Sequence, residues 1–277
     1  TLLWITSKWR PHGFINLISL KKLWSFGSYV LFTGIFNSIA KNLDDLIVGK
    51  VFSASTLGFF VRAKSTRAIP ENIFSNILST TTFSVLSKLN DNPQEYRKKH
   101  NYFFRLSVFL FIPLTFGLNL ICDDIVILLY GKKWLSSIPL LQILSIGLLP
   151  SMLSSFFNQS LIGYGDSKTT MKLNIIKRSI TLAVLPSGLI LEISSFVLIF
   201  TISQYIGLIF DFAFIIKNIK TKLKDYLKAI YGPIIASFSF IICHYLILNH
   251  VHEIEAGFSL CLKLLLSIGI YLILSFA

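Results

Sequence analysis

Residues 195–216 read SFVLIFTISQYIGLIFDFAFII, and residues 217–228 continue directly as KNIKTKLKDYLK. The first stretch contains one formally charged residue, Asp211, and is long enough to cross the ~30 Å hydrocarbon core of a bilayer as a helix. The second stretch holds five lysines and one aspartate. An apolar span followed by a short basic connection is typical of a membrane helix that ends at the cytoplasmic face.

The same pattern recurs along all 277 residues, of which 53 % are hydrophobic and only 14 % charged. We therefore predict an all-α, polytopic membrane protein with a bundle of about eight transmembrane helices over residues 23–277. Residues 1–22 mix aromatic and basic side chains and are predicted to form an amphipathic cytoplasmic linker. The predicted spans are 23–49, 57–86, 103–121, 137–161, 170–190, 195–216, 228–248 and 258–277.

Basic residues gather at alternate ends of these spans, in four clusters that hold eighteen of the 26 Lys and Arg residues. The clusters are Lys8, Arg10, Lys21 and Lys22; Lys88, Arg97, Lys98, Lys99 and Arg105; Lys168, Lys172, Lys177 and Arg178; and Lys217, Lys220, Lys222, Lys224 and Lys228. The opposite connections hold only Lys50, Lys132 and Lys133. Because such residues stay in the cytoplasm, we predict that both ends of this chain are cytoplasmic. They cap apolar helices instead of forming one stripe, which argues against nucleic-acid binding.

Several other classes of protein are disfavoured by what the sequence lacks. It contains no nucleophile elbow, phosphate-binding Walker loop or zinc-protease motif, so an enzyme is not expected. Cys122, Cys243 and Cys261 form no Cys-x-x-Cys pair, and His250 and His252 in a polar loop are a weak metal signal, so neither a disulfide framework nor a metal site is predicted. No methionine precedes the first residue, and we expect the chain to lack the N-terminal part of a longer protein.

Two adjacent predicted spans carry ionisable side chains at helical spacing, on one face each. The face of the first contains Asn37, Lys41 and Asp44 or Asp45; the face of the second contains Lys64, Arg67, Glu71, Ser75, Ser79 and Thr82. A Lys, Arg or Asp at the centre of a lipid-exposed helix costs about 2.5–3.5 kcal/mol. We therefore expect both faces to line a water-filled interior.

Depth distinguishes the cations of the second span. Arg62 and Lys64 lie about 8–11 Å inside its predicted outer end, from which long side chains reach the headgroups. Arg67 lies about 15 Å inside, and we expect it to contact an anionic substrate group. The alternative is that Glu71, one turn further on, neutralises Arg67 as an i,i+4 pair.

The remaining polar residues of the spans allow more than one interpretation. Lys41 has the same two alternatives beside Asp44 and Asp45, and one of these acids could instead hold a proton or a sodium ion. Asp211 is predicted to pair locally with Lys217, and five of the eight spans, rich in Leu, Ile and Phe with Ser and Thr between, could simply be walls. Amides within or beside the spans could link helices or bind sugar hydroxyls: Asn76, Asn158, Gln159, Asn174 and Gln204.

The first two spans resemble a known family. Residues 43–50, LDDLIVGK, followed by 57–63, LGFFVRA, resemble the part of Wzx-type oligosaccharide flippases in which an Asp-containing helix ends in Ile-Gly-Arg/Lys and the next begins with Leu-Gly. Later landmarks follow in the same order: Pro70, VLSKL at 85–89, GKKW at 131–134 and PLLQIL at 139–144. The resemblance covers about residues 20–180. Ser84 and Lys50 depart from the Pro and Arg common in that family.

The resemblance implies a MATE-like fold of two helical bundles around a central cavity, with this chain as the C-terminal bundle. It implies transfer of polyprenyl diphosphate-linked oligosaccharide repeat units across the bacterial cytoplasmic (inner) membrane, with membrane lipids and possible polysaccharide polymerase and chain-length proteins as partners. Neither a catalytic residue nor a cofactor is expected, apart from possible coupling to H⁺ or Na⁺. The implied diphosphate and glycan contacts are Arg67, Lys64, Arg62, Lys41 and Asn37, and the implied ion-coupling residues are Asp44, Asp45 and Glu71.

Three rival functions remain open at this point. A MATE-like exporter of small cations would need carboxylates without surplus cations, whereas the first two spans hold four cations and three acids. A membrane-embedded polysaccharide polymerase or ligase would need a large outer loop, and the longest here, around residues 122–136, is short. A purely structural scaffold is disfavoured because ionisable residues inside a membrane usually serve a function.

Overall fold

The computed structural model describes residues 45–250 without interruption, with the backbone alone over 239–250. It also describes nine isolated positions: Trp24, Gly27, Ser28, Leu31, Phe32, Gly34, Ile35, Ser38 and Tyr271. Within these residues all regular structure is helical, which confirms the predicted all-α class. The predicted linker 1–22 and, apart from Tyr271, the predicted span 258–277 lie outside the described residues.

Eight α-helices and three short 3₁₀ helices make up the continuous part, after a helical segment at residues 45–51. The α-helices are α3 (Ala54–Leu86), α4 (Pro93–Leu120), α5 (Cys122–Tyr130), α6 (Ile138–Ile146), α7 (Leu148–Gly163), α8 (Ser167–Val184), α9 (Ile193–Ile219) and α10 (Leu223–His250). The 3₁₀ helices are η1 (Ser87–Leu89), η2 (Lys132–Ser137) and η3 (Leu185–Leu189).

The helix starts follow from local capping. Ser53 accepts a hydrogen bond from the Thr56 backbone amide at the start of α3, and Asp166 accepts one from Thr169 at the start of α8. Asn92 does the same for Glu95 and is followed by a proline at the first helical position. This cap explains why α4 begins ten residues before the predicted span 103–121.

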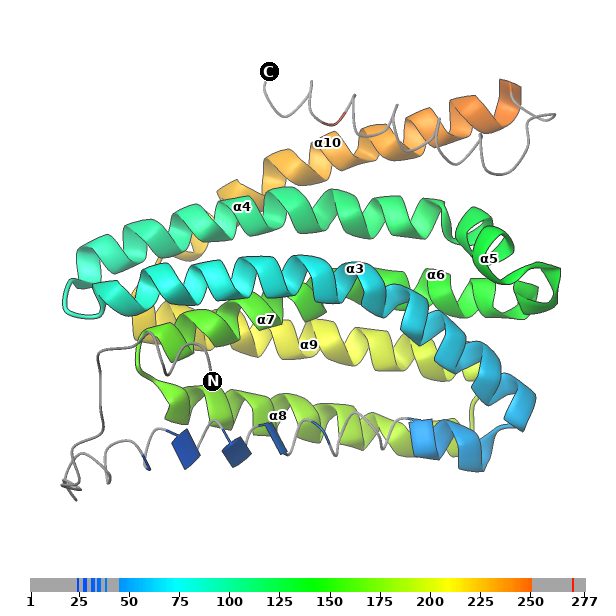
Figure 1. Cartoon of the computed structure of the whole chain (residues 1–277), viewed down its shortest axis with the longest axis horizontal. Helices are drawn as coiled ribbons and strands as arrows, with labels where there is room; N and C mark the ends of the chain where they lie inside the picture. The colour runs from blue at the N-terminus through cyan, green and yellow to red at the C-terminus, as the bar shows by residue number, and fades with distance from the viewer. Residues whose placement is uncertain are drawn as a thin grey trace, which may run out of the picture.

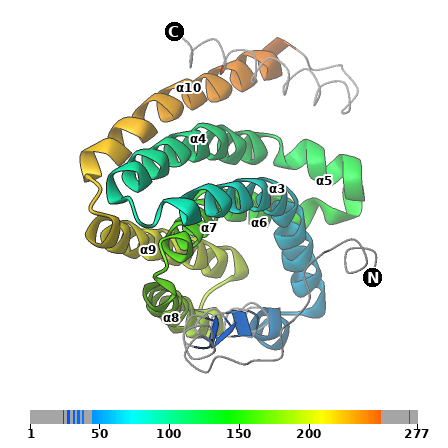
Figure 2. The ribbon, with the colours of Figure 1, turned by 60° about the vertical axis from the view of Figure 1, so that its left-hand side comes forward.

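The long helices run side by side along the longest axis of the molecule (Figure 1). α3 packs most extensively on α7, α4 on α10, and α8 on α9. α8 and α10 lie on opposite sides of the bundle, a separation that persists when the molecule is turned (Figure 2). α5 and η2 lie together at one end, where the chain turns from α4 into α6.

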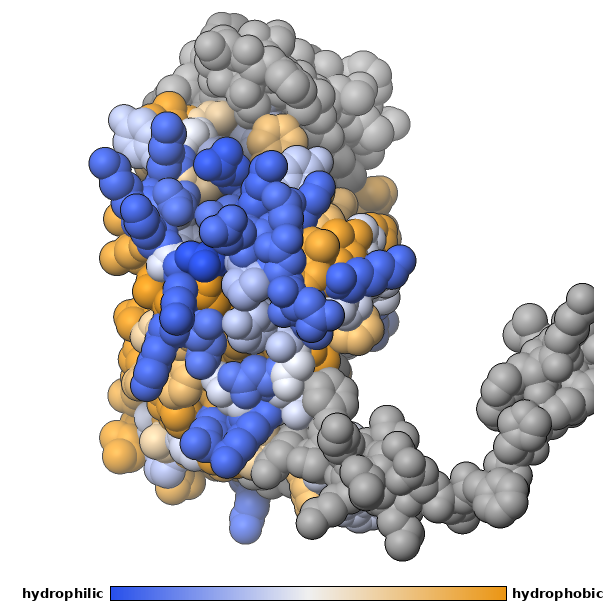
Figure 3. Space-filling view, turned by 90° about the vertical axis from the view of Figure 1, so that its left-hand side faces the viewer, coloured by the Kyte–Doolittle hydropathy of each residue, from blue (hydrophilic) through white to orange (hydrophobic). Residues whose placement is uncertain are grey.

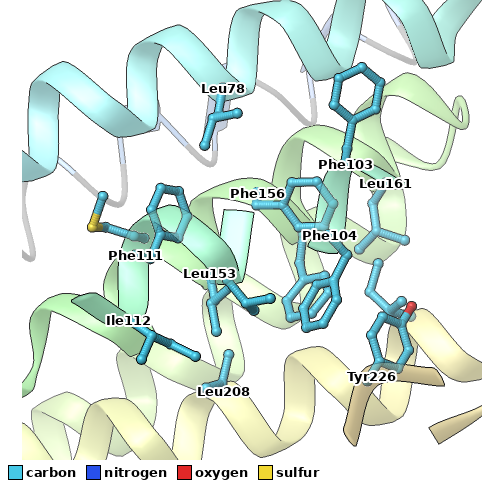
Figure 4. Close-up of a cluster of buried hydrophobic side chains, with 14 of the residues drawn as sticks. Leu78, Phe103, Phe104, Phe111, Ile112, Leu153, Phe156, Leu161, Leu208 and Tyr226 are labelled. Carbon is cyan, nitrogen blue, oxygen red and sulfur yellow. The ribbon is translucent and has the colours of Figure 1, made fainter. Parts of the chain in front are cut away.

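Two clusters of buried apolar side chains hold the bundle together. The larger joins side chains of α4, α7, α9 and α10 (Figure 4), and the rings of Phe104, Phe157 and Tyr226 lie within contact distance of one another. The second joins the start of α3 to α6 and α9 through Phe60, Leu141 and Phe196 among others. Aromatic pairs contribute about 0.5–1.5 kcal/mol beyond their buried area, so the first cluster is a rigid part of the bundle.

By length and composition, two described helices are able to cross a membrane, α4 and α9. A third crossing is added if residues 132–146 and 148–163, which meet at a bend of 40°, count as one. The predicted single span 137–161 is therefore broken at Gly147. The number of eight spans stays a prediction, because much of the first and last predicted spans lies outside the described residues.

The basic residues gather at one end of the bundle. The connections α3–α4, α7–α8 and α9–α10 all open at this end, which forms a hydrophilic face (Figure 3). Its exposed cations are Lys88, Lys98, Lys99, Lys168, Lys172, Lys217, Lys220, Lys222, Lys224 and Lys228. Lys50, Lys132 and Lys133 lie at the opposite end, so the three predicted clusters within the described residues share one side.

Candidate functional site

The described part of the candidate site lies on the first half of α3 and on the helical segment before it. α3 carries Arg62, Lys64, Arg67 and Glu71, and the segment 45–51 carries Asp45. The other predicted site residues, Asn37, Lys41 and Asp44, lie outside the described residues. The geometry below therefore concerns five of the eight predicted positions.

Lys64 and Asp45 form an ion pair between α3 and the preceding helical segment. The Lys64 Nζ lies 2.7 Å from Asp45 Oδ1, and 23 % and 40 % of the two side chains remain exposed. The ammonium also lies 5.7 Å from the centroid of the Phe60 ring. A partly exposed pair of this kind is held loosely, because solvent screens the attraction. The Lys64 side chain thus remains partly accessible to solvent.

Arg62 is held by aromatic rings at the end of the bundle that is poor in cations. Its guanidinium carbon lies 4.6 Å from the ring centroid of Tyr130 and 4.8 Å from that of Trp134. Such cation–π contacts contribute about 0.5–2 kcal/mol each. Arg62 therefore stays near the connection between α5 and η2, with its side chain half-buried.

Arg67 is buried, with 7 % of the residue exposed. Its Nη2 donates to the Gly147 carbonyl at 2.9 Å and to Gln204 Oε1 at 3.2 Å. Its Nε lies 3.4 Å from Glu71 Oε2, so the i,i+4 pair that the sequence left as an alternative is present. Glu71 also accepts a hydrogen bond from the Ser151 hydroxyl. Arg67 thus joins α3 to the α6–α7 break and to α9.

Side chains of neighbouring helices bond the backbone at the break between α6 and α7. Pro150 has no amide proton, so it cannot bond the Ile146 carbonyl one turn back, and Tyr205 OH donates to that carbonyl at 2.8 Å instead. Gly147 is the residue whose carbonyl accepts from Arg67. Carbonyls freed at a helix end inside a membrane need partners from neighbouring helices. Tyr205 of α9 supplies one for the Ile146 carbonyl, and Arg67 of α3 adds a second donor to the Gly147 carbonyl, which also accepts from the Ser151 amide at 3.3 Å.

Further side chains support the end of α6. Asn119 of α4 donates to the Gln142 carbonyl at 2.8 Å, and Thr201 of α9 lies 3.5 Å from the Ile143 carbonyl. A β-carbon on Gly147 would lie 3.0 Å from Gln204 Oε1 and 3.2 Å from the Leu144 carbonyl. The break is therefore a fixed feature of the packing, anchored from three neighbouring helices.

The predicted polar face of α3 does not meet open solvent along its length. Arg67, Ser79 and Thr82 are buried, and α3 packs mainly on α7. An exposed polar row lies instead at Asn72 and Asn76, one turn apart on the same helix. Exposed carboxamides in the middle of a helix of this kind favour contact with water or with a polar partner.

A second charged cluster lies outside the candidate site. Asp211 of α9 is fully buried and accepts from the Lys177 ammonium of α8 at 2.8 Å and 3.1 Å, and from the Ser154 hydroxyl of α7. The predicted local pair with Lys217 is wrong, because a lysine from a neighbouring helix takes that place. The sequence placed Lys177 in a basic cluster, but it did not show that Lys177 pairs with Asp211.

The sequence profile of a family described as "Polysaccharide biosynthesis protein" matches residues 1–139. The chain belongs to this family. Relatives of the chain include an uncharacterized membrane protein in the cps region of Klebsiella pneumoniae, 26 % identical over 94 % of the chain and 54 % of the relative. The lipopolysaccharide biosynthesis protein WzxC of Escherichia coli is 25 % identical over 86 % of the chain and 49 % of its own length. The resemblance to Wzx-type proteins is thereby confirmed.

Solved structures show the same fold. The lipid II flippase MurJ, in an inward closed conformation, superposes with a TM-score of 0.72 at 19 % identity, over 98 % of this chain and 57 % of MurJ. A MATE family multidrug resistance transporter in an outward-facing conformation gives 0.65 at 14 % identity, over 81 % of this chain and 54 % of the transporter. At these identities the likeness shows the fold alone. The chain is thus a multi-pass membrane protein of MATE-like fold, and it spans about half the length of the relatives it matches.

Proposed function

We propose that the full-length protein transfers polyprenyl diphosphate-linked oligosaccharide repeat units from the inner to the outer leaflet of the bacterial cytoplasmic membrane. Membership in a polysaccharide biosynthesis family and a fold shared with a lipid flippase support this proposal. The transferred units would serve surface polysaccharide synthesis, with polymerase and chain-length proteins acting on them at the outer leaflet. The protein itself would break no covalent bond.

The observation that carries the proposal is the partly exposed Lys64 of α3 beside Asp45. α3 holds three cations, Arg62, Lys64 and Arg67, and one acid, Glu71. An apolar wall needs none of them, since each costs free energy in lipid. A diphosphate carries the opposite charge and would form charge-assisted hydrogen bonds with the lysine. Lys64 is the α3 cation best placed to exchange its carboxylate partner for a phosphate.

Transfer would proceed by alternating access, in which one bundle rocks against the other around a central site. Arg67 would hold the α6–α7 break in shape during this movement, while Arg62 and Lys64 face the cargo with Asn37 and Lys41. The lipid tail would stay between helices, in the hydrocarbon. A gradient of H⁺ or Na⁺ would drive the cycle, with Asp44, Asp45 and Glu71 as candidate acids on the first two spans.

Complementation of a strain that lacks the gene tests the proposal. The full-length protein should restore surface polymer and reduce the pool of repeat units that remains on the cytoplasmic leaflet. A membrane-impermeant glycan label measures this pool as the repeat units that react only after spheroplasts are opened. Lys64→Ala should lower transfer roughly tenfold, which corresponds to about 1.4 kcal/mol of lost interaction. Lys98→Ala is the matched control, because this exposed lysine lies at the basic end.

Two results would overturn the proposal. If the wild-type protein left the inner pool unchanged, lipid-linked glycan would not be its cargo, and altered sensitivity of the strain to cationic drugs would favour the exporter alternative. If Lys64→Ala transferred at the wild-type rate at matched expression, Lys64 would have no role in binding the diphosphate.

A further inference from the structure

Three neighbouring helices meet at one buried carboxylate. Asp211 of α9 has no exposed surface, and both its oxygens lie within 3.1 Å of the Lys177 ammonium of α8. The Ser154 hydroxyl of α7 donates to one of the same oxygens. The side chain of Lys177 is 14 % exposed, so the pair lies at the edge of the packed interior and not at its centre.

In the structure, Lys177 and Asp211 neutralise each other's charge. α6, α7 and η3 contribute no acidic, basic or histidine side chain to the helices packed on α9. Arg67 reaches α9 two turns away, at Gln204, and Tyr226 of α10 packs on Phe212. α8 also carries Lys168, Lys172 and Arg178, and Lys177 is the cation whose ammonium contacts Asp211. If either charge of such a pair loses its partner, the other is left buried and uncompensated, at a large cost in free energy.

The ion pair between Lys177 and Asp211 holds α8 against α9. Among the described elements, α8 packs mainly on α9, with smaller contacts to α7 and η3. A β-carbon on Gly207 would lie 3.1 Å from Lys177 Cγ, so the glycine gives the lysine stem room to cross α9. Asn174 adds a long contact to Asn158 of α7, at 3.4 Å. A movement of α8 away from α9 must therefore separate Lys177 from Asp211.

We propose that Asp211 is a proton-carrying site that couples translocation to the proton gradient, with Lys177 as the counter-cation of its ionised form. This inference rests on the proposed function. In the outward-open state of the proposed cycle, water would reach Asp211 and protonate it. The neutral acid no longer holds Lys177, whose ammonium then moves to the polar edge. α8 can then move away from α9 at a low cost in free energy. When the proton leaves to the cytoplasm, the carboxylate reforms its pair and α8 closes on α9.

The donor set favours a proton over a metal cation. The site offers one carboxylate and one hydroxyl, and the lysine ammonium already occupies the position a cation would take. In the part of the chain that the structure describes, no cluster of three or more acid, histidine or cysteine ligands occurs. Na⁺ and divalent ions need more oxygen ligands than this.

Proteoliposomes of the full-length protein, loaded with a lipid-linked glycan and given an imposed pH gradient, test the inference. Wild-type transfer should accelerate several-fold with the gradient, and Asp211→Asn should remove that acceleration. Because this variant could also fail to fold, the double variant Asp211→Leu with Lys177→Met replaces the pair by apolar side chains, a change that buried pairs often tolerate. It should stay folded by thermal unfolding and transfer glycan without responding to the gradient. Asp91→Asn, in an exposed turn, is the control.

The outcomes separate the possibilities. If the folded apolar double variant still responded to the pH gradient, or if the wild type responded only to Na⁺, the proton site would be overturned. If the wild type transferred no glycan under any gradient, the proposed function itself would fail.

Discussion

At the scale of single residues, Arg67 joins three parts of the bundle, because this side chain of α3 bonds the α6–α7 break and α9. Replacement by Lys keeps the charge but supplies a compact ammonium instead of a planar fork, so it cannot reach both Gly147 and Gln204 in the same geometry. We expect Arg67→Lys to lower the stability of the intact protein by about 1–3 kcal/mol. Thermal unfolding in detergent measures this. Arg62→Lys keeps a cation beside Tyr130 and Trp134 and should cost less than about 1 kcal/mol. An equal loss in both variants would contradict the role of Arg67 in joining α3 to Gly147 and Gln204.

Tyr226 offers a second residue-scale test, at the basic end. Its hydroxyl lies 2.8 Å from His100 Nε2 and 2.8 Å from Thr221 Oγ1, and all three groups are buried. Tyr226→Phe keeps the ring in the aromatic cluster and leaves two buried groups without this partner, so it should cost about 1–3 kcal/mol. Tyr231→Phe in the same helix alters an exposed ring and should change nothing measurable in the same unfolding experiment. A Tyr226→Phe protein as stable as wild type would show that water replaces the hydroxyl.

Residue contacts were predictable from the sequence only where they are local. The Arg67–Glu71 pair follows from i,i+4 spacing, which fixes the two side chains on one face of a helix. Lys177 and Asp211 lie 34 residues apart, and their pairing depends on how α8 docks on α9. For Asp211, the nearest lysine along the chain was the wrong partner, because sequence distance along one helix says nothing about the adjacent helix.

At the scale of elements, the break between α6 and α7 should be sensitive to substitution at Gly147. A β-carbon there would crowd Gln204 and the Leu144 carbonyl, and backbone cannot yield as a side chain can. We expect Gly147→Ala to destabilise the protein by about 1–3 kcal/mol through this overpacking. Gly58→Ala is the matched control: nothing lies within 4 Å of its β-carbon, and alanine favours a helix over glycine by about 1 kcal/mol. Thermal unfolding should move in opposite directions for the two variants, and parallel shifts would refute the packing argument.

The helices themselves were largely predictable, and the break was not. Long apolar runs bounded by basic connections identified the segments that became α4 and α9, since crossing a bilayer imposes length and composition. Hydropathy is continuous through residues 137–161, so it gave no sign of the bend. Gly147 and Pro150 were visible, but a proline in a membrane helix is often accommodated without a break. What decides the geometry is the set of donors from α3, α4 and α9, which only the packed bundle reveals.

At the scale of the whole molecule, the charge asymmetry predicts the orientation in the membrane. Three basic clusters share one end, and Lys132 and Lys133 lie at the other. In a background without the native cysteines, Lys222→Cys should react with a membrane-impermeant maleimide only after spheroplasts are opened. Lys132→Cys should react in intact spheroplasts. The reverse pattern would place the basic end outside and contradict the assignment of both chain ends to the cytoplasm.

The same labelling result decides the order of events within the cycle. With the basic end inside, Lys64 lies about 15 Å from the outer end of α3, whereas Asp211 lies about 12 Å from the inner end of α9. Lys64 would then hold the diphosphate near the outer half of the bundle, where the cargo leaves, and Asp211 would release its proton near the half through which the cargo enters. Reversed labelling would exchange these halves, so Lys64 would meet the diphosphate on entry, and Lys64→Ala would impair capture of the cargo from the inner leaflet instead of its release.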